Sequence, residues 1–279
     1  MPDLHLQHVY AITMDDRFTL IDDATIVISG ERILYAGPAA GAPAPKLEAR
    51  VIDTAGKVAL PGLINAHTHL AMTLFRGAAD DLPLKTWLEE KIWPVEAHIT
   101  PEDVYWASLL GIAEMLRAGV TTFSDMYWHV ETVADAVRES GIRACLSGVV
   151  IGLLPNADAM LDRAIERVKT FAGEGHPRIT PYFGPHAPYT VPAPMLRRII
   201  EAASELGVGI NTHLSETSEE VAQSLQVHGM TPIAYVNQVG LFEVPAIAAH
   251  CVHPTEEEMR ILTERGVGVA HCASSNMKL

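Results

Sequence analysis

The chain has 279 residues, of which 48% are hydrophobic and 19% are charged, a balance typical of soluble globular proteins. Its formal net charge of −14 disfavours contact with nucleic-acid phosphates and anionic lipid, so neither nucleic acid nor a membrane is an expected partner. Three cysteines are too few for a disulfide framework, and the first residues lack the basic region and apolar core of a signal peptide. We therefore expect a soluble, cytoplasmic protein.

The first 57 residues read as short strands separated by turns. Strands are expected over 4–13, 24–29, 32–36 and 51–53. The turn residues Ser29, Gly30 and Glu31 predict a hairpin between the second and third of these strands. Residues 1–57 are therefore assigned to a small β-rich domain.

From residue 58 onward, apolar strand-like runs alternate with longer segments of helical period, the pattern of βα units around a parallel sheet. Strands are expected over 58–65, 120–125, 143–150, 179–184, 209–213, 246–250 and 268–271. Helices are expected over 101–118, 130–140, 157–171, 194–206, 218–228 and 255–265. We assign residues 58–279 to a (β/α)8 TIM-like barrel of the α/β class. Because such a barrel closes with eight strands, strand eight is expected to be missing from this chain.

Polar residues follow most of the predicted barrel strands, at the end where such folds carry their chemistry. The strand ends lead into His67, His69, Asp125, His186, His213, His250 and His271. Since the carboxyl ends of the strands meet at one mouth of a barrel, these histidines are expected to converge there.

His67 and His69 are two residues apart in an extended segment, so both imidazoles point to the same side. His213 would complete a three-nitrogen site of the kind that holds catalytic zinc. The alternative for each is a hydrogen-bonded loop or core histidine. We predict one divalent metal ion at these three residues, Zn²⁺ in first place and Fe²⁺ as the alternative, since imidazole suits both.

Glu216 lies three residues after His213 and is the predicted carrier of a proton between the attacking water and a ring nitrogen of the substrate. Its structural alternative is an acid near a helix N-terminus, where it interacts with the helix dipole. His250 is predicted to hydrogen-bond the water or the leaving group, with a core histidine as the alternative. Cys272 is interpreted as buried packing, and no role is assigned to His253 or His271.

Five segments resemble the amidohydrolase superfamily, in the family's order. They are P-G-L-I-N-A-H-T-H at 61–69, G-P-H at 184–186, H-L-S-E-T at 213–217, A-A-H-C-V-H at 248–253 and S-S-N-M-K-L at 274–279. The branch that the chain most resembles is that of the 5'-methylthioadenosine/S-adenosylhomocysteine deaminases, which adjoin the s-triazine hydrolases. The resemblance implies that the β-rich N-terminal residues begin a small β-sandwich domain.

The resemblance also implies a role for each matching residue. Glu216 would be the proton shuttle, and His250 would assist the water. Glu96 matches the family acid that binds the ribose hydroxyls, which suits a carboxylate because it can accept from two adjacent hydroxyls. His186 matches a histidine that contacts the substrate. The family's metal ligands match His67, His69 and His213.

Three departures from the family pattern shape the expected activity. The family's fourth metal ligand is an aspartate that ends strand eight, so residues 1–279 alone are expected to be poorly active or inactive. The predicted fourth strand carries no lysine, which favours a single metal ion over two. The loop at 153–160 has no arginine of the kind with which some members bind the homocysteine carboxylate. Its absence favours 5'-methylthioadenosine or adenosine over S-adenosylhomocysteine.

The activity that the resemblance implies is metal-dependent hydrolytic deamination of an adenine nucleoside such as 5'-methylthioadenosine, adenosine or S-adenosylhomocysteine. One alternative keeps the site and changes the substrate to an s-triazine or another heterocycle. A second alternative is a non-catalytic metal-binding fragment. Exposed edges of an unclosed sheet favour self-association, so a homo-oligomer is an expected state.

Overall fold

The computed structural model describes residues 3–79 and 81–279. Contacts divide the chain into two compact units, Met1–Leu63 and Ile64–Leu279. The division falls after residue 63, whereas the sequence places the domain boundary after residue 57. Each unit is built around its own sheet.

The sheet of the first unit is organised around its first strand. Its strands, among the described residues, are β1 (Leu4–Ile12), β2 (Leu20–Ser29), β3 (Arg32–Pro38), β4 (Arg50–Asp53) and β5 (Val58–Ala59). Strand β1 pairs antiparallel with β2 and parallel with β4 and β5, while β3 pairs antiparallel with β2. The buried core is small and contains Val9, Ala11 and Ala24.

The predicted hairpin is confirmed between β2 and β3. Ser29 pairs with Arg32, so Gly30 and Glu31 form a two-residue turn. Gly30 has a φ of 57°, a left-handed conformation that glycine adopts without a steric penalty. The turn residues therefore fix the position at which the chain reverses.

The single strand predicted over 58–65 is wrong, because the structure splits this segment in two. Strand β5 pairs with β1, whereas β6 (Leu63–Thr68) belongs to the sheet of the second unit. Pro61 has no N–H to donate to a neighbouring strand, and Gly62 weakens an extended segment. Residues 60–62 therefore interrupt a segment that the apolar pattern alone predicts to be one continuous strand.

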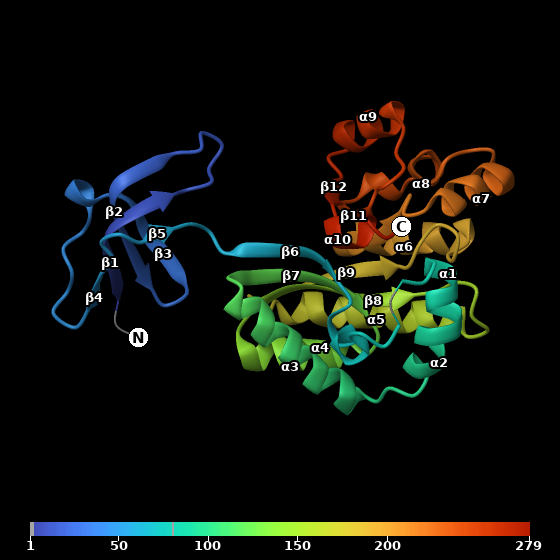
Figure 1. Cartoon of the computed structure of the whole chain (residues 1–279), viewed down its shortest axis with the longest axis horizontal. Helices are drawn as coiled ribbons and strands as arrows, with labels where there is room; N and C mark the ends of the chain where they lie inside the picture. The colour runs from blue at the N-terminus through green and yellow to red at the C-terminus, as the bar shows by residue number, and fades with distance from the viewer. Residues whose placement is uncertain (1–2, 80) are drawn as a thin grey trace. The chain divides into compact units, whose positions relative to one another are not determined.

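The second unit contains, within the described residues, a seven-stranded sheet whose spatial order follows the chain (Figure 1). After β6 come β7 (Val120–Tyr127), β8 (Arg143–Val150), β9 (Ile179–Pro185), β10 (Gly209–Leu214), β11 (Ala246–His250) and β12 (Gly268–Ala270). Every neighbouring pair from β7 to β12 is parallel. Sequential parallel strands joined by helices make a nearly closed TIM-like barrel, so the predicted α/β class and barrel architecture are confirmed.

Helices connect the barrel strands and cover the outside of the sheet (Figure 1). The longer ones are α3 (Pro101–Arg117), α4 (Val130–Ser140), α5 (Ala157–Glu174), α6 (Ala193–Leu206), α7 (Ser218–His228), α8 (Pro232–Val239) and α9 (Glu256–Glu264). All except α8 were predicted. Helix α3 begins as its sequence indicates, with Thr100 and Asp103 in a capping box and proline at the first helical position. In the described part of the chain, no helix is long and apolar enough to cross a membrane.

Apolar layers between strands and helices stabilise the barrel. Phe123 of β7 is buried in one cluster with Val137 of α4. Phe183 of β9 and Ile210 of β10 are buried in another cluster with Leu196 of α6. Burial of each large apolar side chain contributes roughly 1.5–3 kcal/mol. These contacts hold the strands rigidly, and with them the loops that follow the strand ends.

The inside of the barrel carries a polar cross-link between three strands. The Asn211 amide of β10 donates to the hydroxyl of Ser124 on β7 at 3.2 Å and to that of Ser147 on β8 at 3.4 Å. All three side chains are buried. A buried amide is costly to leave unpaired, so these bonds favour one placement of β10 opposite β7 and β8.

We predict that Gly209→Ala destabilises the barrel by roughly 1–3 kcal/mol, because overpacking in a rigid core costs that much. An added Cβ at Gly209 would lie 2.4 Å from the Tyr182 ring and 2.7 Å from the backbone oxygen of Pro245. Gly173→Ala is the matched control. An added Cβ there meets nothing within 4 Å, and alanine favours the helix by up to about 1 kcal/mol. Urea denaturation measures both changes, and equal midpoints for the two variants would contradict the packing at β10.

Candidate active site

A buried aspartate fixes the segment that carries His67 and His69 at the end of β6. Asp125 Oδ1 on β7 accepts hydrogen bonds from the Thr68 hydroxyl at 2.8 Å and from the Leu70 backbone N–H at 2.6 Å. Burial raises the pKa of Asp125 to about 6, and these two hydrogen bonds oppose that rise. The two histidines therefore flank a residue that is held to the neighbouring strand.

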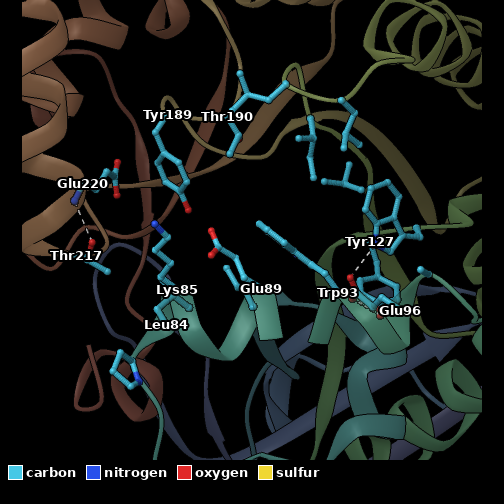
Figure 2. Close-up of a pocket in the computed structure, with 18 of the residues that line it drawn as sticks. Leu84, Lys85, Glu89, Trp93, Glu96, Tyr127, Tyr189, Thr190, Thr217 and Glu220 are labelled. Atoms are coloured by element: carbon cyan, nitrogen blue, oxygen red, sulfur yellow. Dashed lines mark hydrogen bonds between the residues drawn. The ribbon is translucent and has the colours of Figure 1, made fainter. Parts of the chain in front are cut away.

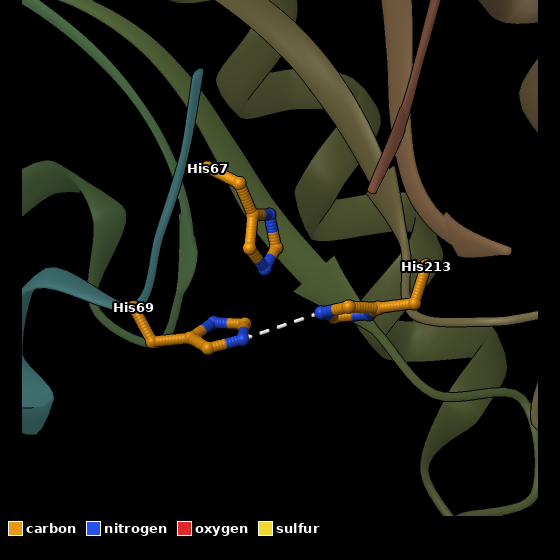
Figure 3. A group of neighbouring side chains, drawn as sticks. All are labelled: His67, His69 and His213. Carbon is orange, nitrogen blue, oxygen red and sulfur yellow. Dashed lines mark hydrogen bonds between the residues drawn. The ribbon is translucent and has the colours of Figure 1, made fainter. Parts of the chain in front are cut away.

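His67, His69 and His213 converge although 144 residues separate the last two (Figure 3). The ring centroids of His67 lie 4.9 Å from those of both His69 and His213. One ligand atom from each of the three lies within 4.8 Å of the other two. His213 reaches this place from β10, whose residues are all buried. The structure thus brings together the three predicted metal ligands.

Backbone carbonyls orient two of the three imidazoles. His69 Nδ1 lies 2.7 Å from the Met126 oxygen, and His213 Nδ1 lies 2.8 Å from the His186 oxygen. A carbonyl only accepts, so each Nδ1 carries the proton and each neutral ring keeps the lone pair of Nε2. These Nε2 atoms face each other at 3.2 Å.

The donor set fits a bound cation. Burial is the largest cause that lowers the pKa of His69 and His213, so a proton is disfavoured between their Nε2 atoms. Burial, followed by the neighbouring histidines, lowers the pKa of His67 to about 2. Neutral imidazoles with converging lone pairs repel each other unless a positive ion lies among them. Nitrogen donors of this kind suit zinc or iron.

Glu216 and His250 lie side by side next to this cluster. Glu216 follows β10, His250 ends β11, and their Oε1 and Nε2 atoms are 3.5 Å apart. The Asn276 amide donates to the His250 backbone oxygen at 3.3 Å, and Asn276 Oδ1 lies 3.0 Å from His250 Nδ1. Asn276 therefore keeps the proton of His250 on Nδ1 and turns Nε2 toward Glu216.

Glu216 is only 8% exposed. Burial is the larger cause that raises its pKa to about 7, and the charge of Glu220 is the second. Burial also lowers the pKa of His250, which keeps that ring neutral. A neutral imidazole beside a carboxyl with this pKa can pass protons in either direction.

Glu96 lies at the end of α2 (Trp93–Glu96), where two aromatic side chains hold its carboxylate (Figure 2). The Tyr127 hydroxyl donates to Oε1 at 2.7 Å, and the Trp128 indole N–H donates to Oε2 at 3.2 Å. Each oxygen keeps a further lone pair. Tyr127 and Trp128 were not predicted as site residues; the only sequence signal is that Tyr127 ends strand β7 and Trp128 follows it.

A cavity of about 1670 Å³ opens beside these groups (Figure 2). Glu96, Tyr127 and Trp128 line it, together with Tyr189 and Thr190. The Tyr189 ring lies edge-on to that of His186, and Thr190 Oγ1 lies 3.0 Å from His186 Nδ1. The His186 ring in turn lies 4.9 Å from that of His213. The predicted substrate residue His186 therefore lies between the cavity and the histidine cluster.

The structure changes the interpretation of two further features. Arg163 of α5 lines the cavity, just beyond the loop at 153–160 that lacks a cation. Because Arg163 can supply a cation there, the composition of this loop no longer favours 5'-methylthioadenosine or adenosine over S-adenosylhomocysteine. Cys272, interpreted as packing, has its Sγ within 4.8 Å of ligand atoms of His67 and His250. His271 is exposed and touches Asn276, and His253 is exposed as well.

Comparison with known proteins places this geometry in a family. The model of the amidohydrolase family matches residues 58–279, and the chain belongs to this family. It is 52% identical over 260 residues to a 5-methylthioadenosine/S-adenosylhomocysteine deaminase of Moorella thermoacetica, covering 93% of this chain and 61% of the relative. A relative of the same name from Pelotomaculum thermopropionicum is 46% identical, covering 100% of this chain and 64% of the relative.

Solved structures agree with the family assignment. An adenosine deaminase from Xanthomonas campestris with bound zinc superimposes with a TM-score of 0.92 at 36% identity, covering 100% of this chain and 64% of that chain. An atrazine chlorohydrolase from Arthrobacter aurescens TC1, complexed with zinc, is 23% identical with a TM-score of 0.86 and shares the fold, over 99% of this chain and 66% of that one. The chain thus spans about three fifths of the length of the curated relatives it matches.

We predict that His67→Ala, His69→Ala and His213→Ala each weaken zinc binding by more than about 100-fold. Loss of an outer partner alone costs roughly 10- to 100-fold, and these variants remove a donor nitrogen itself. His98→Ala is the control, since this exposed histidine belongs to none of the donor groups. Competition with a chromogenic chelator measures the affinity, and an unchanged affinity in His213→Ala would contradict the assignment.

Proposed function

We propose that this chain, as a member of the amidohydrolase family, carries the metal and substrate site of an enzyme that hydrolytically deaminates an adenine nucleoside. Its candidate substrates are 5'-methylthioadenosine, adenosine and S-adenosylhomocysteine. The observation that carries the proposal is the buried Glu216 carboxyl 3.5 Å from His250, whose ring centroid lies 5.3 Å from that of His67 and 5.5 Å from that of His213. The names of the relatives, which include methylthioadenosine and adenosine deaminases, support the same substrate class.

His67, His69 and His213 would hold one divalent ion, zinc in first place. When bound, this ion supplies the Lewis acidity that makes water a nucleophile at neutral pH. Met126 and His186 contribute through their backbone oxygens, which keep the donor nitrogens of His69 and His213 directed at one point. The contribution of the barrel is therefore to position these rings.

Glu216 would manage the protons of the reaction. Water adds at C6 of the purine, and Glu216 takes a proton from it and delivers one to the adjacent ring nitrogen. A second proton then passes from the added hydroxyl to the amino group, the bond between C6 and the amino nitrogen breaks as the C6 carbonyl forms, and ammonia leaves. A carboxyl with a pKa near 7 can accept and return these protons at neutral pH, and the neutral His250 ring lies 3.5 Å from it.

Glu96 would bind the sugar of the nucleoside. Tyr127 and Trp128 each occupy one lone pair of its carboxylate, so each oxygen keeps another for a hydroxyl. Two adjacent acceptors match the two neighbouring hydroxyls of a ribose. Farther along the cavity wall, Ile151 and Met160 offer apolar contacts to a substituent on the sugar, and Arg163 offers a cation to a carboxylate.

We predict that Glu216→Gln leaves zinc bound and lowers kcat for 5'-methylthioadenosine by at least about 100-fold. Glutamine keeps the size of the side chain but cannot carry a proton, and general acid–base catalysis contributes about 10²–10⁴-fold. Ammonia release by the zinc-loaded enzyme, in a form that includes the family's strand-eight aspartate, measures the rate, and metal analysis provides the control. Undiminished turnover would remove Glu216 from the mechanism, and a wild-type protein that binds zinc without releasing ammonia would favour a non-catalytic metal protein.

We predict that Glu96→Ala raises KM for nucleosides about tenfold or more and leaves KM for free adenine unchanged. A hydrogen bond to a charged group contributes roughly 1.5–3 kcal/mol. Only a nucleoside, which carries ribose hydroxyls, loses such bonds when Glu96 is removed. Glu90→Ala, at an exposed acid near the same helix, is the control. An equal effect on base and nucleoside would favour a free heterocycle, such as an s-triazine, as the substrate.

A further inference from the structure

Glu220 is a buried acid that the proposed reaction does not use directly. It lies in the first turn of α7, is 5% exposed, and is one of the residues labelled in Figure 2. Its Oε1 accepts from the Ser215 backbone N–H at 3.0 Å, and its Oε2 accepts from the Glu216 backbone N–H at 2.7 Å. Both carboxylate oxygens thus bind the backbone of the turn that presents Glu216.

This arrangement differs from the helix caps elsewhere in the barrel. In α3 and α9 the acid at the third helical position accepts from the backbone N–H of the N-cap residue, Thr100 or Thr255. Glu220 occupies the same position of α7, and Thr217 caps it in the usual way by accepting from its N–H. Its carboxylate, however, bonds to the two amides that precede Thr217. The side chain therefore acts on the catalytic turn as well as on the helix.

The turn between β10 and α7 needs such a restraint because its backbone is strained. Ser215 has a φ of 49°, a left-handed conformation that non-glycine residues rarely adopt. His250 and Cys251, at the end of β11, have φ values of 73° and 45°. Strain at adjacent turns persists only where the surrounding contacts determine the conformation fully.

Backbone hydrogen bonds join these two strained turns into one structure. The Leu214 oxygen accepts from Cys251 N–H at 3.0 Å, and the Ser215 oxygen accepts from Val252 N–H at 2.9 Å and His253 N–H at 3.2 Å. On its other side, the Ser215 peptide is held by Glu220. The residues that carry Glu216 and His250 therefore share one hydrogen-bonded unit.

We propose that Glu220 is a positioning residue that holds the Glu216 carboxyl opposite the His250 ring. Its carboxylate bonds the 215 and 216 amides and so fixes the strained turn from which the Glu216 side chain departs. This inference rests on the proposed function, because it assigns Glu216 the role of proton carrier. A misplacement of about 1 Å at such a group can cost about 100-fold in rate.

The chemistry of the contact explains why glutamate is needed here. A carboxylate presents two acceptors, and hydrogen bonds from N–H groups to a charged acceptor are stronger than neutral ones. A glutamine amide keeps one acceptor but turns an NH₂ toward the second N–H. That second backbone N–H would then be buried without a partner. An aspartate keeps the charge but is one methylene too short to reach both amides.

The decisive experiment compares Glu220→Gln and Glu220→Asp with Glu258→Gln in the zinc-loaded enzyme, in a form that includes the family's strand-eight aspartate. Glu258 is also buried, also lies at the third position of its helix and also caps it, but its carboxylate accepts from the Thr255 amide and not from the 215 or 216 amide. We expect both Glu220 variants to lose about 10- to 100-fold in kcat with KM and zinc content within about twofold of wild type. Glu258→Gln should lower thermal stability and leave kcat within about twofold. Equal kcat values in the Glu220 and Glu258 variants would overturn the proposal.

Hydrogen exchange at the 215 and 216 amides tests the restraint without reference to turnover. Glu220→Gln should speed exchange of these amides about tenfold or more, while Glu258→Gln leaves them unchanged, because only Glu220 accepts from them. If the wild-type protein deaminates no nucleoside, the proposed function fails but this measurement still applies. Unchanged exchange in the Glu220 variants, in a folded protein, would overturn the positioning role.

Discussion

The contact on which the site depends is the approach of His69 Nε2 to His213 Nε2 at 3.2 Å. Each of these rings donates its other nitrogen to a backbone oxygen, so the facing atoms are both acceptors. Two acceptors at this distance repel each other, and burial disfavours a proton between them. The fold holds these two nitrogen atoms together at the ends of β6 and β10. A divalent cation between them would turn their repulsion into attraction.

The other residues of the site lie around these two imidazoles. Glu216 follows β10 and His250 ends β11, and backbone hydrogen bonds join the turns after these two strands. Glu96 comes from a short helix on the other side of the cavity, where Tyr127 and Trp128 hold its carboxylate. The strands themselves supply His67, His213 and His250, while the segments after them and a short helix supply His69, Glu216 and Glu96. Site residues at the carboxyl ends of the strands are general in barrels of this kind.

Much of this could be predicted from the sequence, since strand ends in a parallel barrel share one mouth. His67, His69 and His213 were predicted as one donor set because each follows an apolar run, and the structure brings them together. The partners of Glu96 could not be predicted, because Tyr127 lies 31 residues away and the contact depends on tertiary packing. Glu220 was missed for a different reason: its position after Thr217 matches an ordinary capping box, which accounts for the acid without any further role.

The segments that sequence reasoning placed wrongly have equally local causes. The run at 58–65 is apolar throughout its first half, and only the proline and glycine within it indicate the break between β5 and β6. Arg163 could not be predicted from the segment at 153–160, because it lies in the second turn of α5, which also borders the cavity. Periodicity identifies elements, but it does not show which of their residues border a distant site.

The most direct test of the account is anomalous X-ray diffraction at the zinc edge from crystals of the zinc-loaded protein. We expect one strong anomalous peak within bonding distance of nitrogen atoms of His67, His69 and His213, with Glu216 beside it. A peak bound instead by Cys272 with His250, or zinc density away from His69 and His213, would contradict the proposed centre.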